Sequence, residues 1–377
     1  MNWIAKGDTI IFSPEFDYKL DISLISKYSK LIFSDHTLNY MLFEKYKNKD
    51  FSNLVYRRSN FNQEVNNISQ SLTHLTFGFS FNQKVNALPE NLTHLTFGFS
   101  FNQEVNALPE NLTYLIFGNN FSQKVNDLPQ CLIYLIFGNN FSQKVNDLPV
   151  SLKYLTFGYH FNQEVDFLPS NLTHLIFGNN FNKKVNNLPT SLTYLTFGKN
   201  FNQEVNMLPQ NLTHLTFGEN FNQEVNILPQ NLTHLTFGCW FIREVNMLPQ
   251  NLTHLTFGTL FNQKVNNLPI TITHLIFGEN FNQELNCLPN SIEELELGNN
   301  FNMELNNLPS SIRKIIFCED SKYMKELNCL PNFVEMLQLP RKYDKKISNL
   351  PLSLKIIECS KNYEYINDFT NLFVLYY

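Results

Sequence analysis

Hydrophobic and polar positions along most of the chain recur at one fixed interval, so that the pattern of residues 92–111 returns at 112–131 and again at 132–151. This stretch reads LTHLTFGFSFNQEVNALPEN, and its apolar positions are Leu92, Leu95, Phe97, Phe101, Val105 and Leu108. One polar residue separates Leu95 from Phe97, which is the alternation of a short β-strand with two side chains inside and one outside. The pattern therefore predicts one short strand in each period.

Glycine and proline occupy fixed places in this period. Of the 13 glycines, all but one lie at 78, 98, 118 and onward at the same interval to 298. Of the 16 prolines, all but four lie at 89, 109, 129 and onward to 309. A glycine directly after a strand indicates either positive φ or a close approach of two backbones. Proline and asparagine in the rest of the period favour an extended return segment with corners. Corner asparagines such as Asn120 and Asn140 are expected to hydrogen-bond to backbone groups of neighbouring coils.

One period cannot bury its own Leu and Phe side chains, so successive periods must stack, with parallel strands about 4.8 Å apart. We predict a solenoid of about 19 coils with little or no helix, forming a single repeat domain over residues 1–377. Regular repeats occupy residues 58–317, and degenerate capping coils occupy residues 1–57 and 318–377. The strand cores expected in the first cap are Ile10–Phe12, Leu31–Phe33 and Leu54–Tyr56, with a short helix over 38–46, and the last coil is expected at Leu372–Leu375–Tyr377.

The motif L-x-x-L-x-F-G-x-N-F resembles the core of leucine-rich repeats. An FNQ-like tripeptide recurs 13 times from residue 61 to 301, and the full unit with LP and SLTHLTFG looks like the FNIP repeat. That family is similar to leucine-rich repeats and is found in social amoebae and in giant viruses that infect amoebae. The return segment FNQEVNALP lacks the proline and glycine that often intervene in the family's longer unit. The resemblance implies a right-handed, leucine-rich-repeat-like solenoid.

The resemblance also suggests functions. A non-catalytic scaffold that binds a protein partner on its strand face is the first interpretation. Some members of the family resemble F-box proteins at the N-terminus, which implies an adaptor of a ubiquitin ligase. Residues 1–57 contain degenerate repeats where an F-box would need several helices, so an adaptor would have to act through a partner. A structural or virion-associated protein is the third interpretation.

Composition narrows the classes of partner. The net charge is -5 and 43% of residues are hydrophobic, which argues against global disorder and against a nucleic-acid binder. No run of 18 apolar residues and no secretory signal is present, so neither a membrane nor a secreted location is expected. The six cysteines form no CxxC pair. We expect a cytoplasmic monomer, in the host cytoplasm if it is viral, with no cofactor and no metal.

The third position of the period, next to the first buried strand residue, carries most of the histidines. Four of them are consecutive and follow a tyrosine: Tyr194, His214, His234, His254 and His274. Such a column suggests either a metal-binding or pH-sensitive strip or a stack of parallel rings, and parallel rings suit stacking better than tetrahedral ligation. No GxSxG, phosphate loop or HExxH motif occurs, so the sequence does not predict an enzyme.

The strongest departure from the repeat lies at residues 238–262. Trp240 and Leu260 replace the corner asparagine, and Arg243 replaces the glutamine of the tripeptide. Trp and Arg are enriched in binding hot spots. Two interpretations stay open: the two apolar side chains fold inward and repair the corner, or they form an exposed binding spot with Arg243 at its rim.

Overall fold

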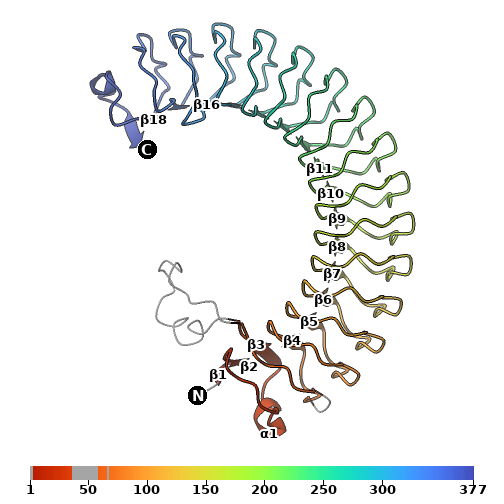
Figure 1. Cartoon of the computed structure of the whole chain (residues 1–377). Coiled ribbons are helices and arrows are strands. Elements are labelled where there is room, and N and C mark those ends of the chain that lie inside the picture. Colours follow the sequence, from red (N-terminus) through yellow and green to blue (C-terminus); the bar gives the residue numbers. More distant parts are fainter. Residues whose placement is uncertain (1–2, 36–57, 66–67) are drawn as a thin grey trace. The chain divides into compact units, whose positions relative to one another are not determined.

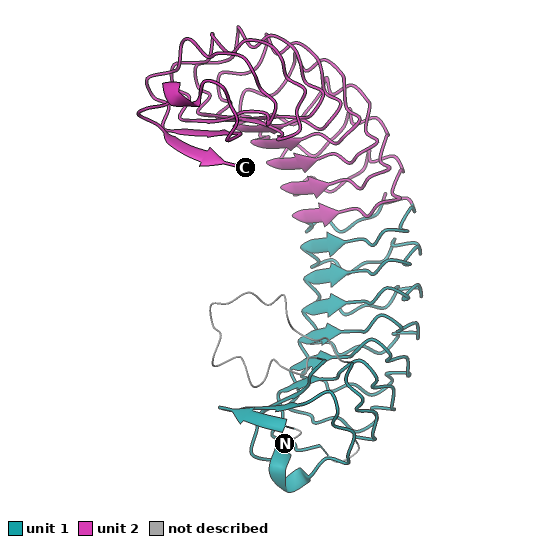
Figure 2. Cartoon of the chain, turned by 60° about the vertical axis from the view of Figure 1, so that its left-hand side comes forward, with its two compact units in different colours: residues 1–183, 187–192 teal, residues 184–186, 193–377 magenta. Residues whose placement is uncertain are grey.

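The computed structural model describes residues 3–35, 58–65 and 68–377, which form two compact units. Unit 1 is Met1–Lys183 with Asn187–Leu192, and unit 2 is Lys184–Asn186 with Thr193–Tyr377 (Figures 1 and 2). Each unit is a parallel β-solenoid in which short strands stack on one side and irregular return segments lie on the other (Figure 2). This confirms the predicted repeat architecture.

Unit 1 begins with a hairpin. Strands β1 (Trp3–Lys6) and β2 (Thr9–Phe12) pair antiparallel around Gly7, whose φ is 58°. The repeat pattern did not predict this reversed strand. A short helix α1 (Ile22–Ile25) and β3 (Lys30–Phe33) follow. The remaining strands of unit 1 are β4 (His74–Thr76), β5 (His94–Thr96), β6 (Tyr114–Ile116), β7 (Tyr134–Ile136), β8 (Tyr154–Thr156) and β9 (His174–Ile176).

Unit 2 continues the same three- or four-residue strands. They are β10 (Tyr194–Thr196), β11 (His214–Thr216), β12 (His234–Thr236), β13 (His254–Thr256), β14 (His274–Ile276), β15 (Glu294–Leu297), β16 (Lys314–Phe317), β17 (Met336–Gln338), β18 (Ile356–Cys359) and β19 (Phe373–Tyr376). A 3₁₀ turn, η1 (Ile366–Asp368), precedes β19. None of the helices in the described ranges has the length and apolarity to cross a membrane.

The core consists of identical columns of side chains. Leu215 lies opposite Leu235 in the parallel register, and both are 1% exposed. Phe217 stacks on Phe221 of its own coil at a ring-centroid distance of 3.7 Å, and Phe221 faces Phe241 of the next coil at 6.1 Å. Phe221 thus lies between its equivalents Phe201 and Phe241, so its burial comes from the adjacent coils, as the sequence predicts.

The glycine after each strand marks a contact between backbones. A Cβ atom built on Gly218 would lie 1.9 Å from the carbonyl oxygen of Gly198, and one on Gly98 would lie 1.9 Å from that of Gly78. Among the residues that the structure describes, Gly7 alone has positive φ. Close approach, and not an unusual φ, therefore explains why glycine recurs at this position.

Hydrogen bonds between return segments come from the FNQ-like tripeptide. Gln223 Nε2 donates to the backbone oxygen of Asn202 at 3.1 Å, and Asn222 Oδ1 accepts from the backbone nitrogen of Ile242 at 3.1 Å. At the corner, Asn220 Nδ2 donates to Asn200 Oδ1 at 3.1 Å. The prediction that corner asparagines bind backbone groups thus named the wrong asparagine, because the tripeptide asparagine takes that role.

The terminal coils keep the repeat pattern in part. β2 and β3 confirm two of the expected strand cores, whereas Leu54–Tyr56 and the helix expected over 38–46 lie outside the described residues. In β19, Val374 lies opposite the buried Ile357, so the strand core expected at Leu372 and Leu375 was wrong by one residue. The single-domain interpretation with boundaries at 57 and 317 stays a prediction.

Asp35 binds two backbone donors next to β4. Its Oδ1 atom accepts the backbone N–H groups of Ser59 at 2.9 Å and Phe79 at 2.8 Å. At the equivalent position of a later coil, the backbone nitrogen of Tyr159 donates to Asn139 Oδ1 at 3.4 Å. A carboxylate therefore satisfies two backbone donors where the regular ladder of unit 1 begins.

Candidate protein-binding surface

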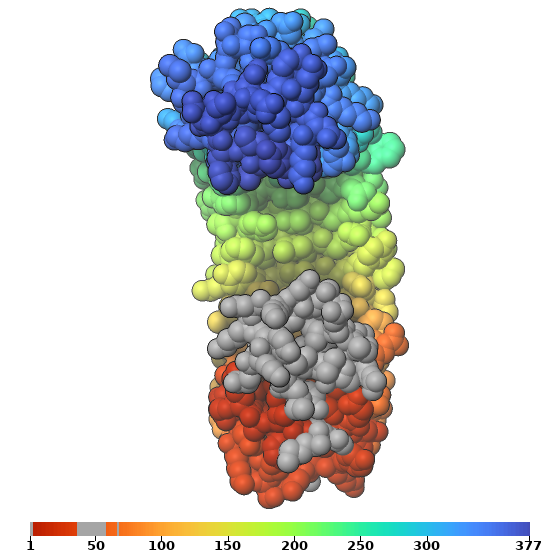
Figure 3. All heavy atoms as spheres, turned by 90° about the vertical axis from the view of Figure 1, so that its left-hand side faces the viewer, coloured from red at the N-terminus to blue at the C-terminus, as the bar shows by residue number. Residues whose placement is uncertain are grey.

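The aromatic column of unit 2 lies on the solvent-facing side of the strands, opposite to the buried leucines. His214, His234 and His254 stack on one another with centroid distances of 4.2 and 4.1 Å and interplanar angles of 13° and 12°. His254 stacks on His274 at 4.1 Å, and Tyr194 lies 5.5 Å from His214. The five residues therefore form one continuous row of half-buried rings across β10 to β14. In the space-filling view, the yellow-green coils in the middle of the chain follow one another as parallel rows (Figure 3).

Threonines hold the rings of this row in place. Thr233 Oγ1 lies 3.1 Å from the backbone oxygen of Thr213 and 2.9 Å from Nδ1 of His234. The equivalent contact between Thr253 and His254 also measures 2.9 Å. Because the hydroxyl is anchored to the preceding coil, each imidazole has a fixed orientation and turns Nε2 away from the threonine.

Burial makes this row electrically neutral at its centre. Burial, followed by the neighbouring imidazoles of His214 and His254, lowers the pKa of His234 from 6.5 to about 4. Burial is also the main cause that lowers the pKa of His254, with His274 as the next cause. At neutral pH the middle of the row therefore presents uncharged aromatic rings with hydrogen-bonding nitrogen atoms, and acid would place repelling charges 4.1–4.2 Å apart.

The row ends at a group of charges on β15 and β16. His274 Nε2 lies 3.8 Å from Glu294 Oε1, and Lys314 Nζ lies 3.3 Å from Glu294 Oε2. The small interplanar angles of the histidine rings agree with the expectation that this column is a stack of parallel rings. No group of three His, Cys, Asp or Glu residues suited to a metal occurs in the part of the chain that the structure describes.

Trp240 projects into solvent at the corner next to β12. Its side chain is 57% exposed, and its backbone nitrogen donates to Glu219 O at 2.8 Å, the bond that Asn220 makes to Lys199 O. The backbone therefore keeps the repeat geometry while the side chain does not turn inward. Leu260, one coil further, is half-buried. The inward interpretation is thus wrong for Trp240.

The two replacements interrupt a polar ladder. Asn220 is bonded to Asn200, and Asn300 Nδ2 is bonded to Asn280 Oδ1 at 2.8 Å, so the asparagine ladder stops before Trp240 and resumes after Leu260. Arg243 is exposed on the return segment, where its Nε atom donates to Asn222 O at 3.0 Å. Arg243 thus takes over the bond of the glutamine that it replaces.

The sequence analysis missed a second exposed row in unit 2. Met207, Ile227 and Met247 occupy the opposite corner of three consecutive coils and are 63%, 61% and 65% exposed. The same position holds Asn267 in the next coil. The signal was present in the sequence, because three successive coils carry large apolar residues in a column that is mixed elsewhere.

Comparisons with known proteins agree with the fold. The sequence profile of the FNIP Repeat matches residues 61–100, 84–120, 144–180, 161–200, 181–206, 201–239, 243–280, 264–298 and 281–320. Among proteins of curated function, none matched the chain.

Solved structures with leucine-rich repeats are also similar. CroV588 of a giant virus, described as a novel circular leucine-rich-repeat protein, superposes with a TM-score of 0.78 and 38% identity. The match covers 96% of this chain and 61% of CroV588, so the chain spans less than two thirds of that protein. YopM of Yersinia enterocolitica matches with a TM-score of 0.47 and 20% identity over 98% of this chain and 86% of YopM.

Proposed function

Because the chain belongs to the FNIP repeat family, we propose that it is a non-catalytic scaffold that binds a protein partner through the strand face of unit 2 and the corner at Trp240. The observation that supports this most is the exposure of Trp240, at 57%, in a column where the coils on both sides of the Trp240–Leu260 pair carry asparagine. An exposed tryptophan lowers solubility and does not improve the core, so its position is best accounted for by binding.

The aromatic row beside this corner suits protein recognition. Stacked rings of Tyr194 and the four histidines give a rigid surface that loses little conformational entropy when a partner binds. The row is neutral at its centre at pH 7, so a partner can cover it without burying a charge. Trp240 and Leu260 then supply the apolar contact, and Arg243 supplies a polar rim.

The test is the double variant Trp240→Asn with Leu260→Asn, which restores the residue found in neighbouring coils. We expect its melting temperature to stay within a few degrees of the wild type. In affinity purification from the native cell, we expect the partners that the wild type retains to be lost, with a decrease of more than about 2 kcal/mol in binding free energy once one is isolated.

Two outcomes oppose the proposal. If the variant loses stability and keeps its partners, the two side chains serve the packing of the corner. If stability and partners are both unchanged, binding takes place elsewhere on the molecule. Glu219→Ala, which removes an exposed charged side chain at the same corner, is the matched control and is expected to retain the partners.

A further inference from the structure

A polar hollow between return segments of unit 1 contains three departures from the repeat. The hollow has a volume of about 390 Å³, and its lining includes Asp166, Phe167 and Lys183. Asp166 stands where every other regular coil carries asparagine, and Phe167 is the one aromatic residue of its column. Lys183 replaces the glutamine of the tripeptide. Three departures on two adjacent coils thus meet in one place, which we call the Phe167 hollow.

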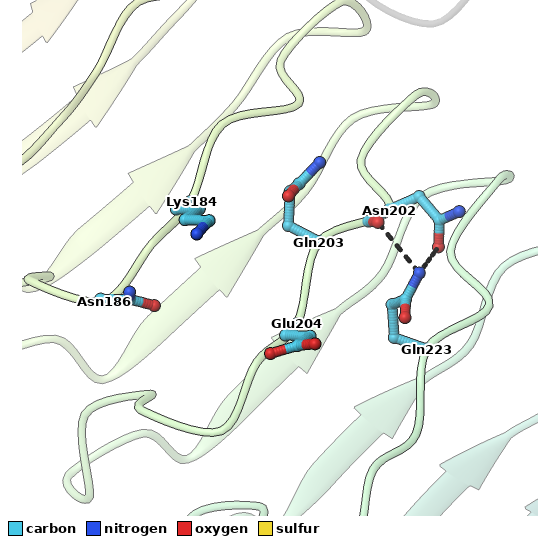
Figure 4. A pocket seen from close by; sticks show the side chains of 6 residues that line it. All are labelled: Lys184, Asn186, Asn202, Gln203, Glu204 and Gln223. Carbon is cyan, nitrogen blue, oxygen red and sulfur yellow. Dashed lines mark hydrogen bonds between the residues drawn. The ribbon is translucent and has the colours of Figure 1, made fainter.

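The consensus form of this hollow lies two coils further along the chain, in unit 2 (Figure 4). It has a volume of about 240 Å³ and is lined by residues that recur in other coils, namely Lys184, Asn186, Asn202, Gln203, Glu204 and Gln223. Gln223 Nε2 donates there to Asn202 O at 3.1 Å and to Asn202 Oδ1 at 3.0 Å. A further consensus hollow at residues 244–283 has a volume of about 450 Å³, so the lining, and not the size, sets the Phe167 hollow apart.

Lys183 gives up a hydrogen bond between coils. Gln163 Nε2 donates to Ser142 O at 2.8 Å, and Arg243, a cation at the tripeptide glutamine position, keeps the equivalent bond to Asn222 O at 3.0 Å. The ammonium group of Lys183 forms neither a hydrogen bond nor an ion pair with any residue that the structure describes, although the side chain is half-buried. An ammonium group is a donor only, so Lys183 presents donors without an acceptor.

Asp166 removes a donor from Glu164. In other coils with glutamate, the asparagine two residues later donates to the carboxylate, as Asn246 Nδ2 does to Glu244 Oε2 at 2.8 Å. Asp166 places a second carboxylate at that position, and no donor within the described ranges binds the carboxylate of Glu164. Asn187 Nδ2 donates to Asp166 Oδ1 at 3.2 Å, which orients the aspartate. Glu164 and the second oxygen of Asp166 are therefore acceptors without a donor.

Phe167 adds an exposed apolar surface to the lining. Its side chain is 70% exposed, and its ring stacks on no other ring in the described part of the chain. Because the ring stays in water, the fold gains little hydrophobic stabilisation from it. The three departures together remove hydrogen bonds of the consensus and expose a ring, without adding a bond within the protein. A ligand that supplies the missing partners would account for all three.

We propose that the Phe167 hollow binds a neutral β-linked saccharide with equatorial hydroxyl groups. Each hydroxyl both donates and accepts, so one molecule can satisfy Lys183, Glu164 and Asp166 together. Hydrogen bonds from hydroxyls to charged groups are stronger than those between neutral groups. The C–H face of such a sugar can pack on the exposed ring of Phe167. A volume of about 390 Å³ also lies within the range of roughly 300–1,000 Å³ in which proteins bind small molecules.

The charges of the lining balance, which argues against an ionic ligand. Lys144 and Lys183 offset Glu164 and Asp166 in number, so an anion would meet two carboxylates and a cation would meet two ammonium groups. A charged peptide would have to bury further charges, whereas a hydroxyl buries none. The hollow belongs to unit 1 and the surface proposed for protein binding belongs to unit 2, so this inference does not depend on the proposed function.

The probes are cellotriose and triacetylchitotriose, titrated into the full chain by isothermal calorimetry in buffer with EDTA. Trigalacturonic acid and the trimer of glucosamine are the anionic and cationic comparisons. We expect at least one neutral sugar to bind at least tenfold more tightly than both charged trimers, with less than a twofold change between low and moderate salt. Binding of neither neutral sugar, or tighter binding of a charged trimer, would overturn the inference.

Triacetylchitotriose coupled to albumin separates two sources of the same sugar. Tighter binding of the coupled form than of the free sugar assigns the hollow to a glycan on a protein, and equal or weaker binding assigns it to a free saccharide. Albumin without sugar is the control. If it binds the chain as tightly as the coupled form does, the ligand is a protein surface and the inference is wrong.

Three substitutions that restore the consensus locate the site. Asp166→Asn with Phe167→Asn and Lys183→Gln introduces residues found at these positions in other coils. We expect at least a tenfold loss of affinity for the neutral sugar, with a melting temperature equal to or above that of the wild type. Met207→Asn, in the column of Phe167 but in unit 2, is the matched control and is expected to stay within twofold. Normal binding by the triple variant, or an equal loss in the control, contradicts the proposal.

The reverse change tests the same residues by a gain of binding. Asn206→Asp with Met207→Phe and Gln223→Lys introduces the three departures at the consensus hollow of Figure 4. We expect this chain to bind a second molecule of the neutral sugar in the same titration. Circular dichroism and thermal melting establish that each variant is folded. A folded variant with unchanged stoichiometry would overturn the assignment of sugar binding to these three positions.

Discussion

Replacing Gly218 by alanine tests whether contact between coils explains the glycine column. The Cβ atom would lie 1.9 Å from Gly198 O, 2.4 Å from Gly198 C and 2.9 Å from Lys199 N, all of which are backbone atoms. Ordinary contact begins near 3.4 Å, so the two coils must separate locally by roughly 1.5 Å. A side chain could turn away from such a clash, but these backbone atoms are held by the stack.

The magnitude follows from the bonds that the separation breaks. Asn220 N donates to Lys199 O at 2.8 Å and Phe197 N donates to Thr216 O at 2.9 Å, and both bonds join the two coils that must separate. Loss of one or two such bonds costs about 0.5–1.5 kcal/mol each, and forced overpacking costs about 1–3 kcal/mol. The lower backbone entropy of unfolded alanine offsets about 0.4–1 kcal/mol. We expect a net loss of about 2–4 kcal/mol.

Urea unfolding followed by circular dichroism measures this loss, with Glu219→Ala as the control at the neighbouring exposed residue. Gly218→Asn separates the two possible causes, since asparagine tolerates positive φ but carries a Cβ atom. Contact between coils predicts that asparagine is at least as harmful as alanine. A Gly218→Ala variant within about 0.5 kcal/mol of the wild type, or clear rescue by asparagine, would refute the reasoning.

Two further predictions concern the start of the ladder and the histidine row. Asp35→Ala is expected to destabilise the protein by about 1–3 kcal/mol, because it leaves the backbone donors of Ser59 and Phe79 without their carboxylate. Urea unfolding measures this loss, with Asp127→Ala at an exposed site as the control. Equal destabilisation by the two variants would contradict the capping role of Asp35. The pKa of His234 is lower in the folded protein than in the unfolded chain, so acid favours unfolding, and stability is expected to be full above pH 6.5 and to fall as the pH decreases toward 4. His234→Tyr, which introduces the ring that other coils carry at this position, is expected to flatten this dependence in unfolding curves recorded across that range, and an unchanged pH profile would show that the row does not control it.

The sequence shows which residues recur in every coil, but it does not show which side chains of adjacent coils contact one another. The spacing of Leu95, Phe97 and Gly98 predicts a strand, its buried residues and a special position after it, because all three depend on local alternation. Which asparagine column bonds to the next coil depends on the direction of each side chain in the stack, and a common period makes all columns look alike. The direction of the Trp240 side chain could not be predicted for the same reason, because a corner residue has the same repeat spacing whether it points inward or into solvent.

The other differences between the sequence prediction and the structure lie in segments that do not follow the regular repeat, or that depart from its consensus. β1 carries no repeat pattern, and only Gly7 signals the reversal that pairs it with β2. Val374 takes the strand position expected for Leu375, because β19 follows β18 at a shorter interval than the repeat and the period no longer fixes the register. The apolar residues Met207, Ile227 and Met247 were visible as a departure in composition, but their exposure could be known only from the structure.

The regular register of the bonds between coils has a consequence for how the molecule can change in length. In unit 2, Thr213 N donates to Thr193 O, Thr233 N to Thr213 O and Thr253 N to Thr233 O, so each coil bonds to a neighbour that offers the same atoms in the same order. Excision of residues 214–233 would join two coils whose partners are already correct, whereas loss of half a coil would place corner residues where the next strand must pair. Within the regular coils, the insertion or deletion of a whole coil therefore preserves every bond between coils, so the length of the solenoid can change in steps of one coil without a change in its packing.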